Sequence, residues 1–245
     1  PPIGDLRWKA PRAFKSSQDF KPTALGILVN PYFIVRYNVF KGIKKFSSNF
    51  KNGKLLDFGC GSKPYKSLFN VDEYVGLDTN QSGHSHKNEN IDVLYDGKKI
   101  PFDDSSFDYI FSSEVLEHVF NINEIISELH RVLKVNGKIL ITLPFVWGEH
   151  EQPYDFARYT SFGMKSILEK NGFEIVHHVK TTTYIETVFQ LFTAYIYHTF
   201  VPKGFKTILT LILIAPINLI GIILGKFLPD DKTYYLNNIF MCKKK

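Results

Sequence analysis

Apolar side chains recur along the chain in two patterns, which predict strands and helices. Short apolar runs, typical of buried strands, occur at residues 54–58, 74–77, 91–94, 107–111, 138–143 and 173–179. Apolar positions at helical spacing occur at residues 31–50, 121–133 and 160–171. Because the strands alternate with helices, the pattern predicts a parallel α/β sheet with crossover helices.

Residues 184–228 do not follow this alternation. Their first part is aromatic and apolar with Glu186 as its single charge, and residues 207–225 then run for 19 residues without a charged side chain. That length is close to the ~20 residues that span the hydrocarbon of a membrane. Lys206 and Lys226 flank the stretch, as basic residues flank membrane segments.

The chain after this segment contains one more apolar run, residues 234–242, which predicts a seventh strand. The segment therefore leaves the sheet and returns to it, and Pro216 and Asn218 are expected to interrupt a simple spanning helix. We expect a hydrophobic helical hairpin. A membrane surface, a second subunit of a homodimer and the interior of the protein are three alternatives for what covers it.

Composition excludes two classes of protein. The chain is 44% hydrophobic and 15% aromatic, which excludes intrinsic disorder. Cys60 and Cys242 are its two cysteines, which excludes a disulfide scaffold and favours a reducing compartment. With no signal-peptide pattern at the start, we expect a cytoplasmic protein, with peripheral attachment to the inner face of the membrane as an option. The expected parts are an irregular leader at residues 1–30, a domain at residues 31–183 plus 229–245, and the helical insertion at residues 184–228.

Positive charge is concentrated at the beginning of the chain. Residues 1–54 contain eleven Lys or Arg side chains against Asp5 and Asp19, whereas the formal net charge of the whole chain is +6. Such a segment suits anionic lipid, an acidic substrate or nucleic acid, and a solvated arm is the simpler alternative. We do not expect nucleic acid to be the partner.

The first predicted strand ends in a glycine turn, Asp57-Phe58-Gly59-Cys60-Gly61. Glycines let the backbone pass close under a ligand, and a helix after the turn would offer free N–H groups. A dinucleotide-binding fingerprint has a third glycine where this chain has Pro64. An oxidoreductase or epimerase that uses NAD is therefore the less favoured alternative.

Polar residues also follow the next three predicted strands. Asp78 ends the second strand, where an acid can bind both ribose hydroxyls of an adenosine, and Asp96-Gly97 follows the third. Ser113 and Glu114 follow the fourth. Each residue alone has a structural explanation, as a cap or a turn former. Because ligands of open α/β sheets bind beyond the carboxyl ends of the strands, the order of the whole set predicts a ligand site there.

On these motifs, residues 54–180 resemble the class I S-adenosylmethionine-dependent methyltransferases, in the branch whose core contains D-x-G-C-G. Residues 128–137 are similar to that family's L-x-E-x-x-R-V-L-K-x-G-G motif, with Asn136 in place of its first glycine. The resemblance implies a seven-stranded Rossmann-like sheet with helices on both faces and an antiparallel last strand. The hydrophobic helical insertion then lies between strands six and seven.

The resemblance also implies roles for individual residues, with S-adenosylmethionine as the cofactor. Asp57, Gly59 and Gly61, with Cys60 between the glycines, would line the methionine and ribose portions. Asp78 would hold the ribose hydroxyls, and Asp96 with Gly97 would meet the adenine edge. Ser113 or Glu114 would lie near the amino-acid end of the cofactor.

The loop after the fifth strand covers the methyl-donor pocket in this fold. Its expected acceptor-binding residues are Trp147, Glu149, Glu151, Tyr154, Asp155, Arg158 and Tyr159. The segment is similar to members of the family associated with polysaccharide assembly. We therefore expect O-methylation of a glycan, a lipid-linked molecule or another small acceptor.

His150 is the candidate general base, because a neutral imidazole can take a hydroxyl proton near physiological pH. His118 is the second candidate, or a residue that orients Glu114. We expect no metal, and we interpret His84 and His86 as parts of a solvated loop. The alternative for His150 is a structural histidine that is hydrogen-bonded within a polar loop. The alternative for the whole protein is a non-catalytic membrane-associated module on a methyltransferase scaffold.

Overall fold

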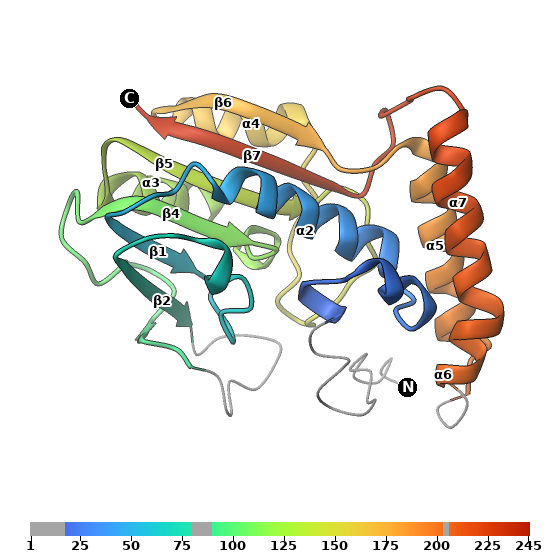
Figure 1. Cartoon of the computed structure of the whole chain (residues 1–245). Helices are drawn as coiled ribbons and strands as arrows, with labels where there is room; N and C mark the ends of the chain where they lie inside the picture. The colour runs from blue at the N-terminus through green and yellow to red at the C-terminus, as the bar shows by residue number, and fades with distance from the viewer. Residues whose placement is uncertain (1–17, 80–89, 203–205) are drawn as a thin grey trace. The chain divides into compact units, whose positions relative to one another are not determined.

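A computed structural model describes residues 18–79, 90–202 and 206–245 (Figure 1). The chain divides into two compact units. The sheet unit contains residues 41–180 and 237–245, and the helical unit contains residues 1–40 and 181–236, each as far as described. The first part of the leader and the loop that carries His84 and His86 lie outside the described residues.

Among the described residues of the sheet unit, seven strands form one sheet. They are β1 (Lys54–Phe58), β2 (Glu73–Thr79), β3 (Val93–Tyr95), β4 (Phe107–Ser113), β5 (Leu133–Pro144), β6 (Phe173–Lys180) and β7 (Asn237–Lys244). Their order is β3-β2-β1-β4-β5-β7-β6, and β7 runs antiparallel to both of its neighbours (Figure 1). The predicted seven-stranded sheet with an antiparallel last strand is confirmed.

Helices accompany the sheet as predicted, and their apolar spacing explains how they pack. The sheet unit contains α3 (Ile122–Val132), α4 (Ser161–Lys170) and the short 3₁₀ helices η2 (Lys66–Leu68) and η3 (Leu116–His118), and α2 (Phe33–Ser47) continues into it from the helical unit. On α3, Ile125, Ile126 and Leu129 are buried in the core. The hydroxyl of Thr160 caps α4 by accepting from Gly163 N at 3.0 Å.

The helical unit is made of η1 (Ala24–Leu28), the beginning of α2, α5 (Tyr184–Thr199) and a second long helical segment. That segment is α6 (Lys206–Leu209), the π-helical turn η5 (Thr210–Ile214) and α7 (Ala215–Phe227), which follow one another without a break. The prediction that Pro216 and Asn218 interrupt the helix is therefore wrong. A proline lacks the N–H that a regular turn needs, and the π-helical turn just before Pro216 accommodates that loss.

Other sequence predictions also differ from the structure. The helix expected after the glycine turn is replaced by η2, because Lys63 adopts a φ of 54° and the residue before a proline is disfavoured in a helix. The seventh strand begins at Asn237, because Leu236 N binds Thr182 Oγ1 within the helical unit. Residues 24–28 of the expected irregular leader form η1.

Candidate active site

The glycine turn after β1 brings two strand ends together. Gly59 has a φ of 72°, and a Cβ atom there would lie 2.4 Å from Val115 Cγ2, so only glycine fits. Gly61 N donates to Asp78 Oδ2 at 2.8 Å, which ties the turn to the end of β2. The sequence-predicted residues Gly61 and Asp78 are thus neighbours at the carboxyl edge of the sheet.

Asp57 lies beneath this turn, and its carboxyl group is buried. It accepts a hydrogen bond from Tyr74 Oη at 2.6 Å. Burial raises the pKa of Asp57 to about 7, so near neutral pH its carboxyl group is partly protonated. Cys60 is buried beside it, and burial likewise raises the pKa of the thiol, which makes it a poor nucleophile.

The structure adds Lys63 and Asp92, which the sequence did not single out as site residues. Lys63 is only 7% exposed, and its Nζ lies 2.6 Å from Asp92 Oδ2. Partial burial acts to raise the pKa of Asp92, but the Gly76 N–H and Lys63 hold it below its ordinary value. A Cβ atom at Gly76 would lie 2.2 Å from Lys63 Cε and 2.7 Å from Cys60 Sγ, so the glycine leaves room for these two side chains.

Asp96 and Gly97 follow β3 at the same edge, in an exposed turn. Lys98 N donates to Asp96 Oδ1 at 3.0 Å, and Gly97 has a φ of 80°. Since Leu94 of β3 is in register with Asp78 of β2, the turn begins next to the end of β2.

Ser113 and Glu114, at the end of β4, belong to one hydrogen-bonded chain. Thr142 Oγ1 donates to Glu114 Oε1 at 2.7 Å, so the Ser113 hydroxyl, 2.8 Å away, donates to Thr142. Asn237 Nδ2 donates to the other Glu114 oxygen at 2.7 Å. Glu114 is therefore oriented by Thr142 and Asn237, two residues that the sequence analysis missed.

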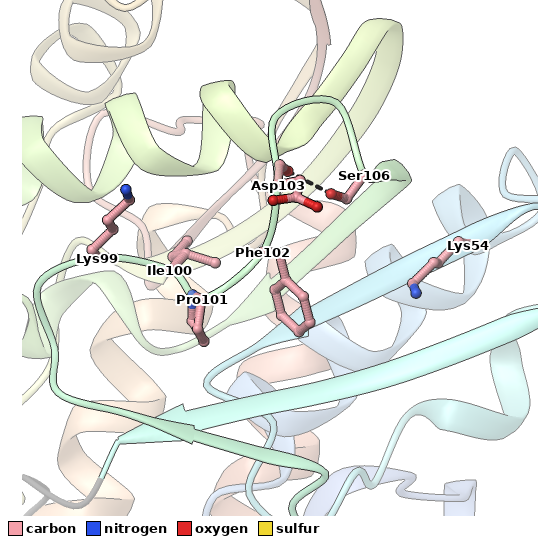
Figure 2. Close-up of a pocket in the computed structure, with 7 residues that line it drawn as sticks. All are labelled: Lys54, Lys99, Ile100, Pro101, Phe102, Asp103 and Ser106. Carbon is pink, nitrogen blue, oxygen red and sulfur yellow. Dashed lines mark hydrogen bonds between the residues drawn. The ribbon is translucent and has the colours of Figure 1, made fainter.

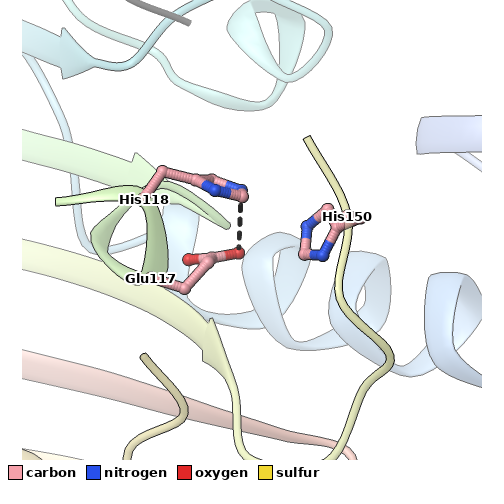
Figure 3. A group of neighbouring side chains, drawn as sticks. All are labelled: Glu117, His118 and His150. Carbon is pink, nitrogen blue, oxygen red and sulfur yellow. Dashed lines mark ion pairs between the residues drawn. The ribbon is translucent and has the colours of Figure 1, made fainter. Parts of the chain in front are cut away.

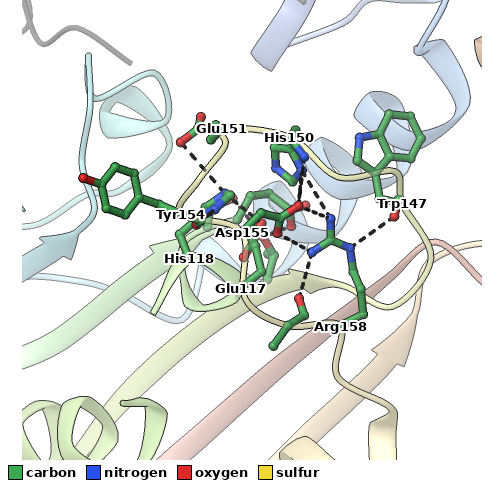
Figure 4. Close-up of polar contacts among 12 residues, drawn as sticks. Glu117, His118, Trp147, His150, Glu151, Tyr154, Asp155 and Arg158 are labelled. Atoms are coloured by element: carbon green, nitrogen blue, oxygen red, sulfur yellow. Dashed lines mark hydrogen bonds and ion pairs between the residues drawn. The ribbon is translucent and has the colours of Figure 1, made fainter. Parts of the chain in front are cut away.

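Arg158 organises the loop after β5, as Figure 4 shows. Its guanidinium group donates to both oxygens of Asp155, at 2.6 and 2.7 Å. It also donates to the backbone carbonyls of Trp147 and Gly148, at 3.2 and 3.0 Å. Burial acts to raise the pKa of Asp155, but the hydrogen bonds from Arg158 hold it below its ordinary value. The carboxylate therefore stays charged.

The other residues predicted to bind the acceptor are placed differently. Glu149 is exposed, and Tyr154 presents its backbone carbonyl to His118 Nδ1 at 2.7 Å. Tyr159 accepts from Asn238 Nδ2 at 3.0 Å, also through its backbone carbonyl. Glu151 lies near His118, with 4.0 Å between Glu151 Oε2 and His118 Nε2. These residues share one loop region, and Asp155 and Arg158 form its buried polar part.

His150 lies within this polar region. Its backbone N donates to Asp155 Oδ2 at 2.8 Å, and its ring Nδ1 is 3.2 Å from the Gly148 carbonyl and 3.4 Å from Asp155 Oδ2. Burial, followed by the nearby His118, lowers the pKa of His150 below its ordinary value. The imidazole is therefore neutral near neutral pH, as a general base requires.

Glu117 is the most unusual acid of the region, and the sequence analysis did not select it. Its side chain is completely buried, and neither carboxylate oxygen has a hydrogen-bond partner among the described residues. Burial, and then the nearby Glu114, raise the pKa of Glu117 well above its ordinary value. Its Oε1 lies 3.7 Å from Nε2 of His118 (Figure 3).

Glu117, His118 and His150 form a group that could hold a metal ion. One ligand atom from each residue lies within 4.8 Å of the others, and the two imidazole rings are 4.8 Å apart (Figure 3). The sequence analysis missed this cluster because His150 is distant along the chain. The ring of His118, which the sequence analysis expected to act as a base or to orient Glu114, contacts Glu117 and the Tyr154 carbonyl.

Comparison with known proteins identifies the domain. The profile of a family described as a methyltransferase domain matches residues 34–178, which is more than half of the chain. The chain belongs to this methyltransferase family. It carries the fold of class I S-adenosylmethionine-dependent methyltransferases, so the predicted enzyme class and cofactor are confirmed at the level of the family.

Two curated relatives of the methyltransferase domain show how far the similarity extends. A ubiquinone biosynthesis O-methyltransferase from Pelagibacter ubique is 31% identical over 152 residues, which cover 57% of this chain and 60% of the relative. Phosphoethanolamine N-methyltransferase 2 from Caenorhabditis elegans is 28% identical over 158 residues, covering 59% of this chain and 35% of the relative. The chain thus matches less than two thirds of the length of either relative.

A solved methyltransferase structure has the same fold as this chain. Phosphoethanolamine N-methyltransferase 2 from Haemonchus contortus, in complex with S-adenosyl-L-methionine, aligns with a TM-score of 0.52 and 20% sequence identity. The alignment covers 96% of this chain and 61% of that chain. At this level of identity the comparison establishes the fold alone.

A cavity of the methyltransferase domain lies away from these residues. It has a volume of about 580 Å³ and is lined by Lys54, Lys99, Ile100, Pro101, Phe102, Asp103 and Ser106 (Figure 2). Lys54 begins β1, and Ser106 directly precedes β4, so the cavity lies at the amino edge of these parallel strands. Ligands of such sheets bind at the opposite, carboxyl edge, where the glycine turn and His150 lie.

Proposed function

We propose that the protein transfers a methyl group from S-adenosylmethionine to a hydroxyl oxygen of a small acceptor, and that glycans and lipid-linked molecules are the candidate classes. The observation that carries the proposal is the position of His150, held through its backbone and its ring against the buried carboxylate of Asp155. The similarity to a ubiquinone biosynthesis O-methyltransferase supports an oxygen acceptor. The family profile supports methyl transfer over the oxidoreductase or epimerase alternative.

The carboxyl edge of the sheet suits a cationic cofactor. Asp57, Asp78 and Asp92 gather there, with Lys63 as the buried cation among them. Asp78 accepts backbone N–H groups from Gly61 and Thr79, and a carboxylate has lone pairs left for ribose hydroxyls. When bound, S-adenosylmethionine supplies a methyl group already activated by its sulfonium centre.

His150 is the residue that we propose removes the acceptor proton. Its Nδ1 lies close to two acceptors, the Gly148 carbonyl and the Asp155 carboxylate, and to one donor, Arg158 Nη2 at 3.3 Å. The proposal requires the tautomer with its proton on Nδ1, which the two acceptors favour and which leaves Nε2 as the base. His150 would accept the hydroxyl proton at Nε2 while the acceptor oxygen bonds to the methyl carbon and the carbon–sulfur bond breaks. Asp155, itself held by Arg158, would stabilise the imidazolium that forms.

Label transfer tests the proposal. Purified protein is incubated with methyl-labelled S-adenosylmethionine and cell extract separated into lipid, glycan and small-molecule pools, and the labelled product is identified. We expect an O-methylated product with the parent protein, and loss of label with His150→Ala although cofactor binding persists. An N-methylated product, or no label in any pool from protein that binds the cofactor, would contradict the proposal.

A second candidate mechanism is favoured by Glu117, which is buried without a hydrogen-bond partner among the described residues. A divalent cation held by Glu117, His118 and His150 would pair this carboxylate and lower the pKa of an acceptor hydroxyl. The two mechanisms differ in their response to a chelator and to Glu117→Gln. Cation-assisted transfer would be abolished by both and restored by Mg²⁺, Mn²⁺ or Zn²⁺ in the parent protein only. With His150 acting alone as the base, turnover survives the chelator.

A further inference from the structure

Helix α5 buries polar side chains and exposes apolar ones. Its buried positions are Thr187, Gln190, Thr193 and Tyr197. Its exposed large side chains are Tyr184, Val188, Phe192 and Tyr195. A helix on the surface of a water-soluble protein has the opposite arrangement, with its apolar stripe facing the core.

The segment from η5 through α7 repeats the pattern. Its buried positions are Thr210, Ile214, Ala215, Asn218 and Gly221. Its exposed positions include Leu211, Ile212, Leu213, Leu219, Ile220 and Ile223. Residues Thr210–Phe227 have a mean hydropathy of 2.0, yet only 28% of them are buried in the protein. A core helix of this composition would be mostly buried.

Small residues bring α5 and α7 into close contact. A Cβ atom at Gly221 would lie 2.5 Å from Phe189 Cβ, and one at Gly225 would lie 2.6 Å from Glu186 Cγ. The two glycines are one turn apart and face the same neighbour, and later residues of α7 meet earlier residues of α5. The helices therefore form an antiparallel hairpin with the glycine-x-x-x-glycine spacing that is characteristic of helix pairs in lipid.

Polar side chains on the inner face of α5 find partners within the helical unit, whereas Thr210 Oγ1 and the side-chain amide of Asn218 have no hydrogen-bond partner among the described residues. Gln190 Nε2 donates to the Pro31 carbonyl at 3.0 Å, and Gln190 Oε1 accepts from Val35 N at 3.1 Å. Thr187 Oγ1 donates to the Thr183 carbonyl at 2.9 Å. The bonds of Gln190 join α5 to residues at the beginning of α2, and the bond of Thr187 lies at the start of α5 itself. Both kinds of bond keep polar groups away from an apolar surrounding.

We propose that the outer faces of α5 and of the segment from η5 through α7 insert into the hydrocarbon of a membrane that carries anionic lipid. Residues 207–225 contain no charged side chain, whereas Lys206 and Lys226 flank them and the first 54 residues of the chain are strongly basic. The hairpin enters and leaves on one side of the membrane, because the strands before and after it, β6 and β7, are paired in one sheet.

Vesicle flotation tests the proposal with the full chain and with phosphatidylglycerol-containing vesicles. The test variant replaces the exposed Leu211, Ile212 and Leu213 by serine. The control variant replaces Val135, Phe162 and Val176, which are exposed large side chains of the sheet unit, by serine as well. We expect the test variant to lose at least about 100-fold in partitioning onto vesicles, whereas the control partitions like the parent. S-adenosylmethionine binding in all three proteins verifies that the sheet unit is folded.

A second measurement does not depend on a triple replacement. Because Cys60 and Cys242 are buried, a polarity-sensitive dye on Ile212→Cys reports on this exposed position, and Val135→Cys serves as the control. We expect a lipid-linked quencher to darken the dye at residue 212 and not at residue 135. Protein that stays in detergent-free solution and never floats would overturn the proposal. So would a dimer that buries the dye at residue 212 without lipid, which would assign this face to a second copy of the chain.

Discussion

In the sheet unit, α3 turns Ile125, Ile126 and Leu129 toward the core, whereas in the helical unit α5 turns Thr187, Gln190 and Thr193 inward. The first arrangement is that of a domain surrounded by water, which gains stability by burying apolar area. The second leaves the apolar side chains outside and joins the helices through glycines and hydrogen bonds. One chain thus contains two regions with opposite distributions of polarity.

The two units also differ in what their polar residues do. The acids of the candidate site, Lys63, and the cluster of Glu117, His118 and His150 all lie in the sheet unit. Within the described part of the helical unit, the buried polar side chains of α5 serve helix packing instead. Changes in one unit should therefore leave the property of the other unit intact, and the following variants test that separation.

The largest effect is expected for His150→Ala. Removal of a general base should lower turnover by about 10²–10⁴-fold with cofactor affinity nearly unchanged. In the parent protein, turnover should rise with pH through a value below the ordinary pKa of 6.5, because only the neutral imidazole accepts a proton. Steady-state kinetics across pH measures both effects.

The matched control for His150 is His177→Ala, which removes an exposed histidine of β6 that stacks on Phe46. It should keep the parent pH profile. If turnover of His150→Ala stayed within a few-fold of the parent, the assignment of the base would be wrong.

Asp78→Ala should weaken cofactor binding by about 10- to 100-fold, the value of one or two hydrogen bonds to a carboxylate. Asp78 also accepts from Gly61 N, so alanine disturbs the glycine turn as well. Asp78→Asn keeps an acceptor for that N–H and should therefore lose less affinity. Titration calorimetry distinguishes them, and unchanged affinity in folded Asp78→Ala would refute the ribose assignment.

Gly221→Leu tests the hairpin without touching the exposed face. The new side chain would meet Phe189 and force α5 and α7 apart, at a cost of about 1–3 kcal/mol. Proteolysis within residues 184–228 should accelerate, with cofactor affinity within about twofold of the parent. The conservative change Ile220→Leu, at an exposed neighbour, should do neither. Equal protease resistance of Gly221→Leu and the parent would contradict the close packing.

The smallest effect concerns pH and stability. Asp57 binds its proton more tightly in the folded chain, with a pKa of about 7, than at its ordinary value of 3.8. Its contribution to stability is therefore fully present below that ordinary value and is lost as pH rises to about 7. Asp57→Asn should flatten this decline in urea unfolding measured between these pH values, whereas the exposed-acid control Asp103→Asn should retain it. An unchanged slope in Asp57→Asn would argue against the raised pKa.

Much of the sheet unit could be predicted from the sequence, because its buried strands are continuous apolar runs and its glycine turn has few alternatives. Lys63 and Glu117 could not, since a charged side chain is ordinarily exposed and burial depends on distant elements. In the helical unit, the sequence does not show which face of a helix is buried. Its periodicity identifies two faces of α5, yet periodicity alone assigns the polar face to water, and the structure turns Thr187 and Gln190 inward.

Hydrogen–deuterium exchange of the full chain, alone, with S-adenosylmethionine and with anionic vesicles, tests the division between the two units most directly. We predict that the cofactor slows exchange at residues 57–63 and 74–79 of the sheet unit. We predict that vesicles slow exchange at residues 184–202 and 206–228 of the helical unit, and that each ligand leaves the other region unchanged. Protection of residues 57–63 by vesicles, or no protection of residues 206–228 by them, would contradict the account.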